Sequence, residues 1–216
     1  MKFIDLTHEL KNDTMVYPGD PKFKLRSIND ANKDYSLFEI NGNLHTGTHI
    51  DAPYHYIANG KKVKDILLEN LIGEANVFDI THLNPKKEIN LEDMITFKKI
   101  FKKKYSLEND LKKIIILKTG WYNNLREENY FTENPFISKE VAKIFVENNI
   151  SGLAIDSPSV DSYRESKIHK ILLKNNIWIV ENLTNMNKIT EGIHKVFFIP
   201  LNIDAEASFV RAFIKI

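Results

Sequence analysis

Residues 44–56 read LHTGTHIDAPYHY and gather several metal-binding side chains in one short stretch. Three of the seven histidines, His45, His49 and His55, lie there together with Asp51. Imidazole and carboxylate are the ligands that borderline divalent metals bind when no thiolate is present. All four positions are odd-numbered, so in an extended chain the four side chains point to the same side. The stretch therefore predicts a strand or strand-like loop with one chemically active face.

The local backbone chemistry supports this interpretation. β-Branched residues and a glycine disfavour a helix here. On a fully extended strand, at ~3.3 Å per residue, His45 and His49 would lie roughly 13 Å apart, which is barely close enough for one ion. Gly47 permits a bend that shortens this distance, and Pro53 ends regular pairing and turns His55 back toward the site. Histidines four apart are also common at exposed or core positions, so spacing alone leaves both roles open.

Composition restricts the class of protein. A chain of 216 residues is expected to form one domain over residues 1–216 with a full core. The formal net charge of +1 argues against a nucleic-acid binder. The absence of cysteine excludes disulfides and thiolate zinc sites and is compatible with a cytoplasmic protein. The first residues lack a signal-peptide pattern, and no apolar run approaches the ~20 residues needed to span a membrane.

Hydrophobic patterning predicts mixed α and β structure. Strands are expected over 3–6, 23–28, 36–40, 75–80, 113–118, 152–155, 177–180, 196–201 and 209–216, helices over 90–104, 138–149 and 166–174, and a short helix or loop over 63–71. The strand–helix–strand order over 152–180 favours parallel pairing. The basic run at 98–104 is typical of a solvated helix C-terminus, rather than of a nucleic-acid surface. The fold class expected is α/β, with a mixed, partly parallel sheet flanked by helices.

The pattern His45-Thr-Gly-Thr-His49-Ile-Asp51-Ala-Pro53-Tyr-His55 resembles the HxGTHxDxPxH signature of the metal-dependent cyclase-like hydrolases. This family includes the bacterial kynurenine formamidases and the isatin hydrolases. The resemblance continues through TMVYPGDP at 14–21, KTGW at 118–121 and DSPSVD at 156–161, and so covers nearly the whole chain. It implies a swivelling β/β/α-type domain and a homodimer or higher homo-oligomer.

The resemblance also implies a two-metal site. Its two-metal members carry a histidine and a glutamate twelve residues apart, the separation of His169 and Glu181 here. One metal would be held by His45, His49 and Asp51. The second would be held by His169, Glu181 and a bridging Asp51. These ligands do not separate zinc from manganese. The resemblance to the two-metal members makes zinc the first choice, with two Zn²⁺ per chain, and manganese is the alternative.

The chemistry expected is hydrolysis of a C–N amide bond by metal-activated water. His55 suits proton transfer because it titrates near neutral pH and is outside the expected ligand set. The resemblance implies N-formylkynurenine as the substrate, which would place the protein in tryptophan catabolism. Residues expected to bind substrate are Tyr17, Trp121 and Ser159, although a packing role for Trp121 is an equal alternative. Other functions left open are an isatin-hydrolase-like enzyme and a metal-stabilised binding domain without turnover.

The last segment departs from the family pattern. Family members often show S-P-x-R-A near the end, and the chain has Ser208-Phe209-Val-Arg211-Ala212 without the proline. The preceding residues 204–207 also lack the usual glycine. The shape of this loop is therefore not predicted.

Overall fold

The computed structural model describes residues 2–28, 34–82, 88–93 and 112–216. Its strands are β1 (Phe3–Asp5), β2 (Lys24–Ser27), β3 (Phe38–Asn41), β4 (His49–Asp51), β5 (Ile72–Asp79), β6 (Glu88–Ile89), β7 (Ile114–Lys118), β8 (Phe136–Ile137), β9 (Gly152–Ile155), β10 (Trp178–Glu181), β11 (Gly192–Pro200) and β12 (Ala207–Lys215). The α-helices are α2 (Lys139–Glu147) and α3 (Lys167–Lys174), and the single-turn 3₁₀ helices are η1 (Pro53–His55), η2 (Val63–Asp65), η3 (Leu68–Asn70), η4 (Trp121–Asn124) and η5 (Met186–Lys188).

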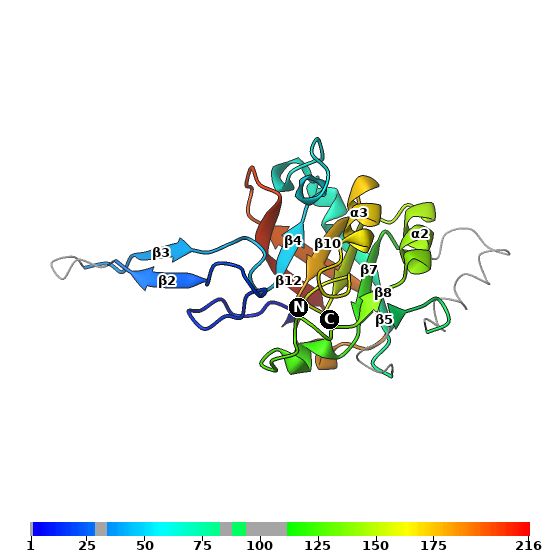
Figure 1. Ribbon diagram of the computed structural model, residues 1–216, viewed down its shortest axis with the longest axis horizontal. Helices are drawn as coiled ribbons and strands as arrows, with labels where there is room; N and C mark the ends of the chain where they lie inside the picture. The colour runs from blue at the N-terminus through cyan, green and yellow to red at the C-terminus, as the bar shows by residue number, and fades with distance from the viewer. Residues whose placement is uncertain (1, 29–33, 83–87, 94–111) are drawn as a thin grey trace.

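The main sheet closes into a barrel. Its strands follow the order β1-β12-β11-β5-β7-β9-β10-β4, and β4 also pairs with β12, which closes every strand except β1 into a ring (Figure 1). Strands β5, β7, β9 and β10 run parallel to one another. Strand β4 pairs antiparallel on both edges, with β10 and β12. The short metal-ligand stretch is therefore the strand at which the barrel closes.

Two hydrophobic cores lie on the two sides of this sheet. Along β7, Ile114 and Ile116 belong to the core inside the barrel. Ile115 and Leu117 alternate with them and belong to the outer core, which is shared with the helices. All four side chains are at most 2% exposed. A strand buried on both faces requires a continuous apolar run, which is why this segment lacks polar alternation.

Helices α2 and α3 cover the parallel part of the barrel from outside (Figure 1). Helix α2 is capped by Ser138, whose hydroxyl accepts a hydrogen bond from the Val141 N–H at 3.2 Å. Helix α3 connects β9 to the parallel strand β10, the crossover that parallel pairing requires. The core that both helices share with the sheet fixes α3, and with it the side chains at the start of α3, against the barrel.

Strands β2 and β3 form a separate antiparallel hairpin that extends away from the barrel (Figure 1). Its side chains are largely exposed, including apolar ones: Phe38 is 55% and Ile40 is 58% exposed. Tyr35 and Leu37, just before β3, are also exposed. The hairpin thus presents apolar surface that the rest of the described chain does not cover.

The predicted fold class is confirmed as mixed α/β with a partly parallel sheet, although closure into a barrel was not predicted. The expected strands and the helices α2 and α3 are present, with ends shifted by a few residues. The segment expected as a short helix or loop contains η2 and η3. The helix expected over 90–104 falls mainly outside the described residues, and residues 91–93 form a turn. No described helix has the length and apolar character needed to cross a membrane.

Candidate metal centre

The stretch around β4 bends where its sequence allows. Gly47 has a φ of +63°, and a side chain there would lie 2.8 Å from a methyl carbon of Leu10. His45 therefore sits in a turn before the strand, and His49 and Asp51 lie within it. Pro53 begins η1, which ends at His55. The backbone brings the three histidine rings together, with His45 and His55 centroids 4.3 Å apart and His45 and His49 centroids 5.1 Å apart.

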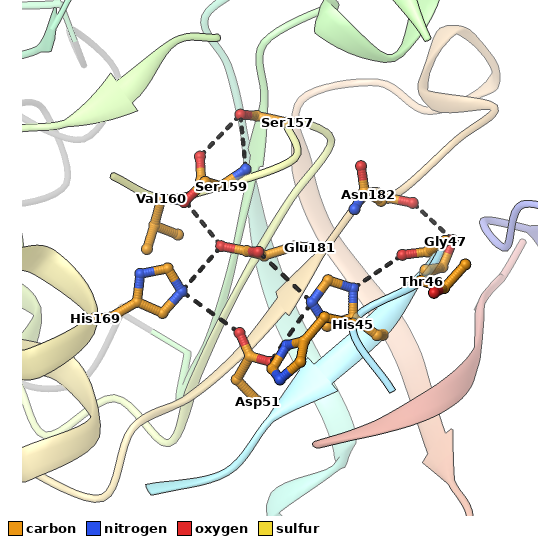
Figure 2. A network of polar contacts seen from close by, with 12 residues as sticks. His45, Thr46, Gly47, Asp51, Ser157, Ser159, Val160, His169, Glu181 and Asn182 are labelled. Atoms are coloured by element: carbon orange, nitrogen blue, oxygen red, sulfur yellow. Dashed lines mark hydrogen bonds and ion pairs between the residues drawn. The ribbon is translucent and has the colours of Figure 1, made fainter. Parts of the chain in front are cut away.

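Two more ligand candidates come from β10 and α3. The antiparallel register places Glu181 directly opposite His49. Helix α3 brings His169 from the outside of the barrel, so that its Nε2 lies 3.2 Å from Glu181 Oε1 and 3.5 Å from Asp51 Oδ2. His49 Nε2 lies 3.5 Å from Asp51 Oδ1 and 3.6 Å from Glu181 Oε2. In Figure 2, the side chain of His169 points toward Asp51 and Glu181.

The cluster is buried, and several of its atoms have no hydrogen-bond partner. His49, Asp51, His169 and Glu181 are at most 6% exposed. In the described part of the chain, His49 Nε2 and both carboxylate oxygens of Asp51 are buried and make no hydrogen bond of good geometry, although His45 Nδ1 lies 2.9 Å from Asp51 Oδ1. Leaving such groups unpaired is costly. Since they are nitrogen and oxygen ligand atoms facing one another, the cluster fits a bound divalent metal.

The side chains fall into two potential ligand groups that share Asp51. One contains His45, Asp51 and His55, and the other contains His49, Asp51 and Glu181. In each group the ligand atoms lie within 4.8 Å of one another. Asp51 is common to both groups, and its bridging role stays a prediction. The division of the histidines differs from the expected one, and His169 is in neither group. His55 lies within the cluster, and its distinct role as a proton carrier stays a prediction.

Two hydrogen bonds determine which histidine nitrogen faces the cluster. Asp161 Oδ2 is 2.7 Å from His169 Nδ1, and the Gly47 carbonyl oxygen is 2.9 Å from His49 Nδ1. A carbonyl or carboxylate oxygen accepts, so Nδ1 donates in each case. In the neutral ring, Nε2 then presents its lone pair to the cluster, the arrangement that a metal-binding histidine needs.

Asp161 also fixes the start of α3. Its carboxylate accepts hydrogen bonds from the N–H groups of Ile168, at 2.8 Å, and His169, at 2.9 Å. The N-cap residue Ser166 makes no side-chain cap, so Asp161 supplies it from the preceding loop. Glu181 is oriented similarly, because its Oε1 accepts a 2.9 Å hydrogen bond from the Val160 N–H (Figure 2).

Charge in the cluster is coupled. Burial opposes ionisation of Asp51, but the neighbouring His45, His49 and His169 outweigh it and hold the pKa of the carboxyl well below its usual value. Burial also opposes the charged form of His169, but Glu181, Asp161 and Asp51 raise its pKa well above the ordinary value. The buried carboxylates thus favour a nearby positive charge, which protons or a metal cation can supply. Burial lowers the pKa of His55 to about 4.

Glu206 is a neighbour that sequence reasoning missed. Its Oε1 lies 3.6 Å from His45 Nε2. The loop before β12 is held against the metal-ligand stretch because the Ala52 N–H donates to the Glu206 carbonyl at 2.8 Å. This is the loop whose shape the sequence left open. Asp161 was also missed as a supporting residue, although it belongs to the family-like segment at 156–161.

A cavity of about 410 Å³ opens above the cluster. This is within the usual size of a small-molecule site. Tyr17 and Ser159, both expected to bind substrate, line it, as do Phe131 and Tyr163. Tyr17 packs on both rings, with centroids 5.7 Å from each. The cavity therefore has a buried polar floor and a partly aromatic wall.

The structure does not bring Trp121 to this cavity. Its side chain is 4% exposed and packs with Tyr130 and Phe131. The indole N–H donates a 2.9 Å hydrogen bond to the Tyr130 carbonyl, and the two rings are stacked. Gly120, with a φ of +83°, turns the chain at this point and allows the indole to fold inward. This position agrees with the packing role that was expected from the sequence as the alternative for Trp121. We therefore do not expect Trp121 to contact the substrate.

This barrel, with a buried histidine–carboxylate cluster beneath a cavity, matches a known class of protein. Residues 4–162 match the Cyclase family, described as "Putative cyclase". The chain therefore belongs to this family of metal-dependent hydrolases. The matched region contains His45, His49, Asp51 and His55 and ends before His169.

Individual relatives match over nearly the whole chain. The kynurenine formamidase of Bacillus thuringiensis subsp. konkukian (strain 97-27) is 29% identical, over 99% of this chain and 97% of that protein. A structure described as a "predicted metal-dependent hydrolase from Bacillus stearothermophilus" has a TM-score of 0.78 at 25% identity, over 99% of this chain and 97% of that one. Isatin hydrolase A from Labrenzia aggregata has a TM-score of 0.83 at 22% identity, over 99% and 93%, and shares the fold.

Proposed function

We propose that this protein is an arylformamidase, a metal-dependent amidohydrolase that converts N-formylkynurenine to kynurenine and formate. The observation that carries the proposal is the buried cluster of His49, Asp51 and Glu181 below an aromatic-walled cavity, in which His49 Nε2 and the Asp51 oxygens lack hydrogen-bond partners. The kynurenine formamidase relatives, similar along nearly their whole length, support the choice of substrate. The reaction would be a step of tryptophan catabolism.

We also propose two Zn²⁺ ions per chain, with Mn²⁺ as the alternative. The residues that would hold them are His45, His49, Asp51, His169 and Glu181, with Asp51 shared. A bound divalent metal supplies water activation at neutral pH and polarises the carbonyl oxygen of the amide. The imidazole ligands favour zinc, and the carboxylates are compatible with manganese.

In the proposed reaction, water adds to the formyl carbon, the C–N bond breaks, and formate and an aromatic amine are released. His55 accepts a proton from the attacking water and donates one to the leaving nitrogen. Its ring lies beside the ligand cluster and lines the cavity. Burial lowers its pKa to about 4, so the ring is neutral at pH 7 with a free nitrogen lone pair, but it is a weaker base than the near-neutral imidazole expected from the sequence. Tyr17 and Phe131 provide apolar surface for the aromatic ring of the substrate.

The test combines metal analysis with a matched substrate panel. Protein purified without a metal-binding tag or chelator is analysed for metals, then assayed with N-formylkynurenine, formanilide and isatin. Zinc together with formate release from N-formylkynurenine supports the proposal. Hydrolysis of isatin alone would replace it with a cyclic amide hydrolase. Bound metal without turnover of any amide would favour a metal-stabilised binding domain, and no metal after reconstitution would refute the metal centre.

We further propose that the protein forms a homodimer through the β2–β3 hairpin. The exposed apolar side chains of Leu37, Phe38 and Ile40 on this projecting element support this assembly. Replacement of Phe38 and Ile40 by glutamate should convert a dimer to a monomer in analytical ultracentrifugation. A wild-type monomer at micromolar concentration would refute it.

The swivelling β/β/α arrangement implied by the family resemblance also stays a proposal, supported by the mixed barrel and its outer helices.

A further inference from the structure

Arg164 occupies an unusual position at the rim of the cavity. It lines the cavity and is exposed, unlike the buried cluster at the floor. It lies in a turn closed by a 3.0 Å hydrogen bond from the Glu165 N–H to the Ser162 carbonyl. Its φ is +62°, the left-handed region. In a turn of this kind, a positive φ at the third position normally selects glycine or asparagine.

The backbone of Arg164 is an exception within this chain. The other described non-glycine residues with positive φ are all asparagines: Asn149, Asn176, Asn182 and Asn185. Asparagine tolerates the left-handed region because its short polar side chain can bond locally, whereas arginine has no such compensation. Conformations of this kind persist where the surrounding structure enforces them and cluster at ligand-binding sites. Arg164 is therefore a candidate for a functional role that glycine could not fill.

Two tyrosines hold Arg164 in place. The Tyr17 hydroxyl accepts a hydrogen bond from the Arg164 N–H at 3.2 Å. The guanidinium carbon lies 5.0 Å from the centre of the Tyr163 ring, a cation–π arrangement. The two tyrosine rings are themselves in contact, with centroids 5.7 Å apart. The aromatic wall of the cavity and the guanidinium thus form one connected unit.

The positive charge of Arg164 has no carboxylate partner among the described residues. The adjacent Glu165 pairs with Lys167 at 2.8 Å. Asp20, across the cavity, accepts a 2.7 Å hydrogen bond from the Asn43 amide. The guanidinium therefore keeps a planar set of N–H donors available at the cavity rim. Arginine uses this geometry to bind carboxylates through two parallel hydrogen bonds.

We propose that Arg164, supported by Tyr163, binds a carboxylate of the substrate at the end remote from the scissile amide. The cavity then selects aromatic amides whose tail carries a carboxylate over those of the same ring size that lack one. This inference rests on the proposed amidohydrolase function and names the substrate class of that site. It favours an amino-acid-bearing aryl formamide over a neutral lactam such as isatin.

The experiment uses the zinc-loaded, full-length protein and two substrates that differ only in the tail. N-formylkynurenine carries the carboxylate, and 2′-formamidoacetophenone has the same aromatic formamide without the amino-acid part. Both are assayed with wild type and with the Arg164→Gln and Arg126→Gln variants. Arg126 is the matched control, because it is an exposed arginine that lines a different cavity. The Arg126→Gln variant measures the effect of losing one positive charge away from the metal-centre cavity.

We expect Arg164→Gln to lower kcat/KM for N-formylkynurenine by about 10-fold or more, mainly through KM, because a charge-assisted hydrogen bond is lost. The neutral substrate should change by less than about twofold, as should both substrates with Arg126→Gln. Equal losses on both substrates, or no loss on N-formylkynurenine, would overturn the inference while the hydrolase function stands.

A binding measurement keeps the inference testable without turnover. Calorimetry compares kynurenine with 2′-aminoacetophenone on wild type and Arg164→Gln. Weaker binding of kynurenine alone in the variant supports the carboxylate site, even if neither formamide is hydrolysed and the proposed function fails. Equal affinity of wild type and variant for kynurenine, or no binding of kynurenine to wild type, would overturn the inference.

Discussion

Glu181 lies directly opposite His49 across the β4–β10 pair, and its Oε2 is 3.6 Å from His49 Nε2. These two residues are far apart in the sequence, and the antiparallel register alone brings them together. Because β4 is also the strand that closes the barrel, the ligand cluster and the closure of the fold depend on the same backbone pairing. Changes to individual ligands should therefore alter metal content more than they alter the fold.

His169→Ala is expected to lower the zinc content from about two ions per chain to about one, since catalytic two-metal sites need ligands for each ion. His169 Nε2 lies 3.2 Å from Glu181 Oε1 and 3.5 Å from Asp51 Oδ2, so its loss removes a nitrogen ligand from beside these two carboxylates. Elemental analysis of the purified variant measures this directly. His82→Ala is the control, because His82 is exposed on a turn after β5. An unchanged zinc content in His169→Ala would remove His169 from the ligand set.

His55→Ala is expected to retain its metal and to lose about 10²- to 10⁴-fold in kcat, the usual contribution of a general acid–base. The structure makes this test informative, since His55 could also join His45 and Asp51 as a ligand. Metal content and rate should be measured on the same preparation. Loss of metal together with activity would assign His55 to the ligand set, and full activity would exclude both roles.

The sequence predicted most of the cluster because its chemistry is local. Period-two spacing, Gly47 and Pro53 place His45, His49 and Asp51 within one bend, and the structure has that bend. His169 and Glu181 were predicted as ligands only from the twelve-residue separation that the family resemblance supplied. Their approach depends on a helix crossing outside the barrel and on strand register, which residue patterns do not encode.

The remaining residues could not be predicted for related reasons. Glu206 reaches His45 because β12 pairs with β4 when the barrel closes, a contact between distant segments. Asp161 contacts His169 through a loop that folds back on its own helix. Trp121 belongs to a segment that resembles one in the family, but the direction of its side chain is set by the turn at Gly120. The spacing of residues in the sequence does not indicate where the side chains of Glu206, Asp161 and Trp121 point.

Asp161→Asn is expected to weaken zinc affinity by about 10- to 100-fold, the usual effect of losing a residue that orients a metal-binding histidine. The amide replaces one acceptor oxygen with a donor, so it cannot accept from the His169 ring and both α3 backbone N–H groups. Chelator competition measures the affinity. The free energy of unfolding should also fall by about 1 kcal/mol through loss of the helix cap.

The matched control for this variant is Ser138→Ala, which removes the side-chain cap of α2. It should lose about 1 kcal/mol of stability, as a cap deletion does, and keep wild-type zinc affinity. If the two variants show equal zinc affinity, the Asp161 contact acts only on the helix and not on the ligand.

Asp156 should make stability fall with rising pH in a defined window. It is fully buried, follows β9, and accepts hydrogen bonds from the Thr119 N–H at 2.8 Å and the Gly120 N–H at 2.8 Å. Burial outweighs these donors and raises its pKa from 3.8 to about 6. The folded state then binds more protons than the unfolded state between these values, so the free energy of unfolding decreases as the pH rises through them.

The expected decrease from this group totals about 3 kcal/mol, of which about 2 kcal/mol falls between pH 4 and 6, and it levels off above about pH 7. Asp156→Asn removes the titration, although the variant is less stable throughout because its amide group faces the Gly120 N–H. Urea unfolding of both proteins at several pH values gives the difference in stability, in which all other titrating groups cancel. The advantage of wild type should shrink as the pH rises from 4 to 6. A difference that stays constant, or grows with pH, would show that the hydrogen bonds to Thr119 and Gly120 outweigh burial and that Asp156 stays ionised in the folded protein.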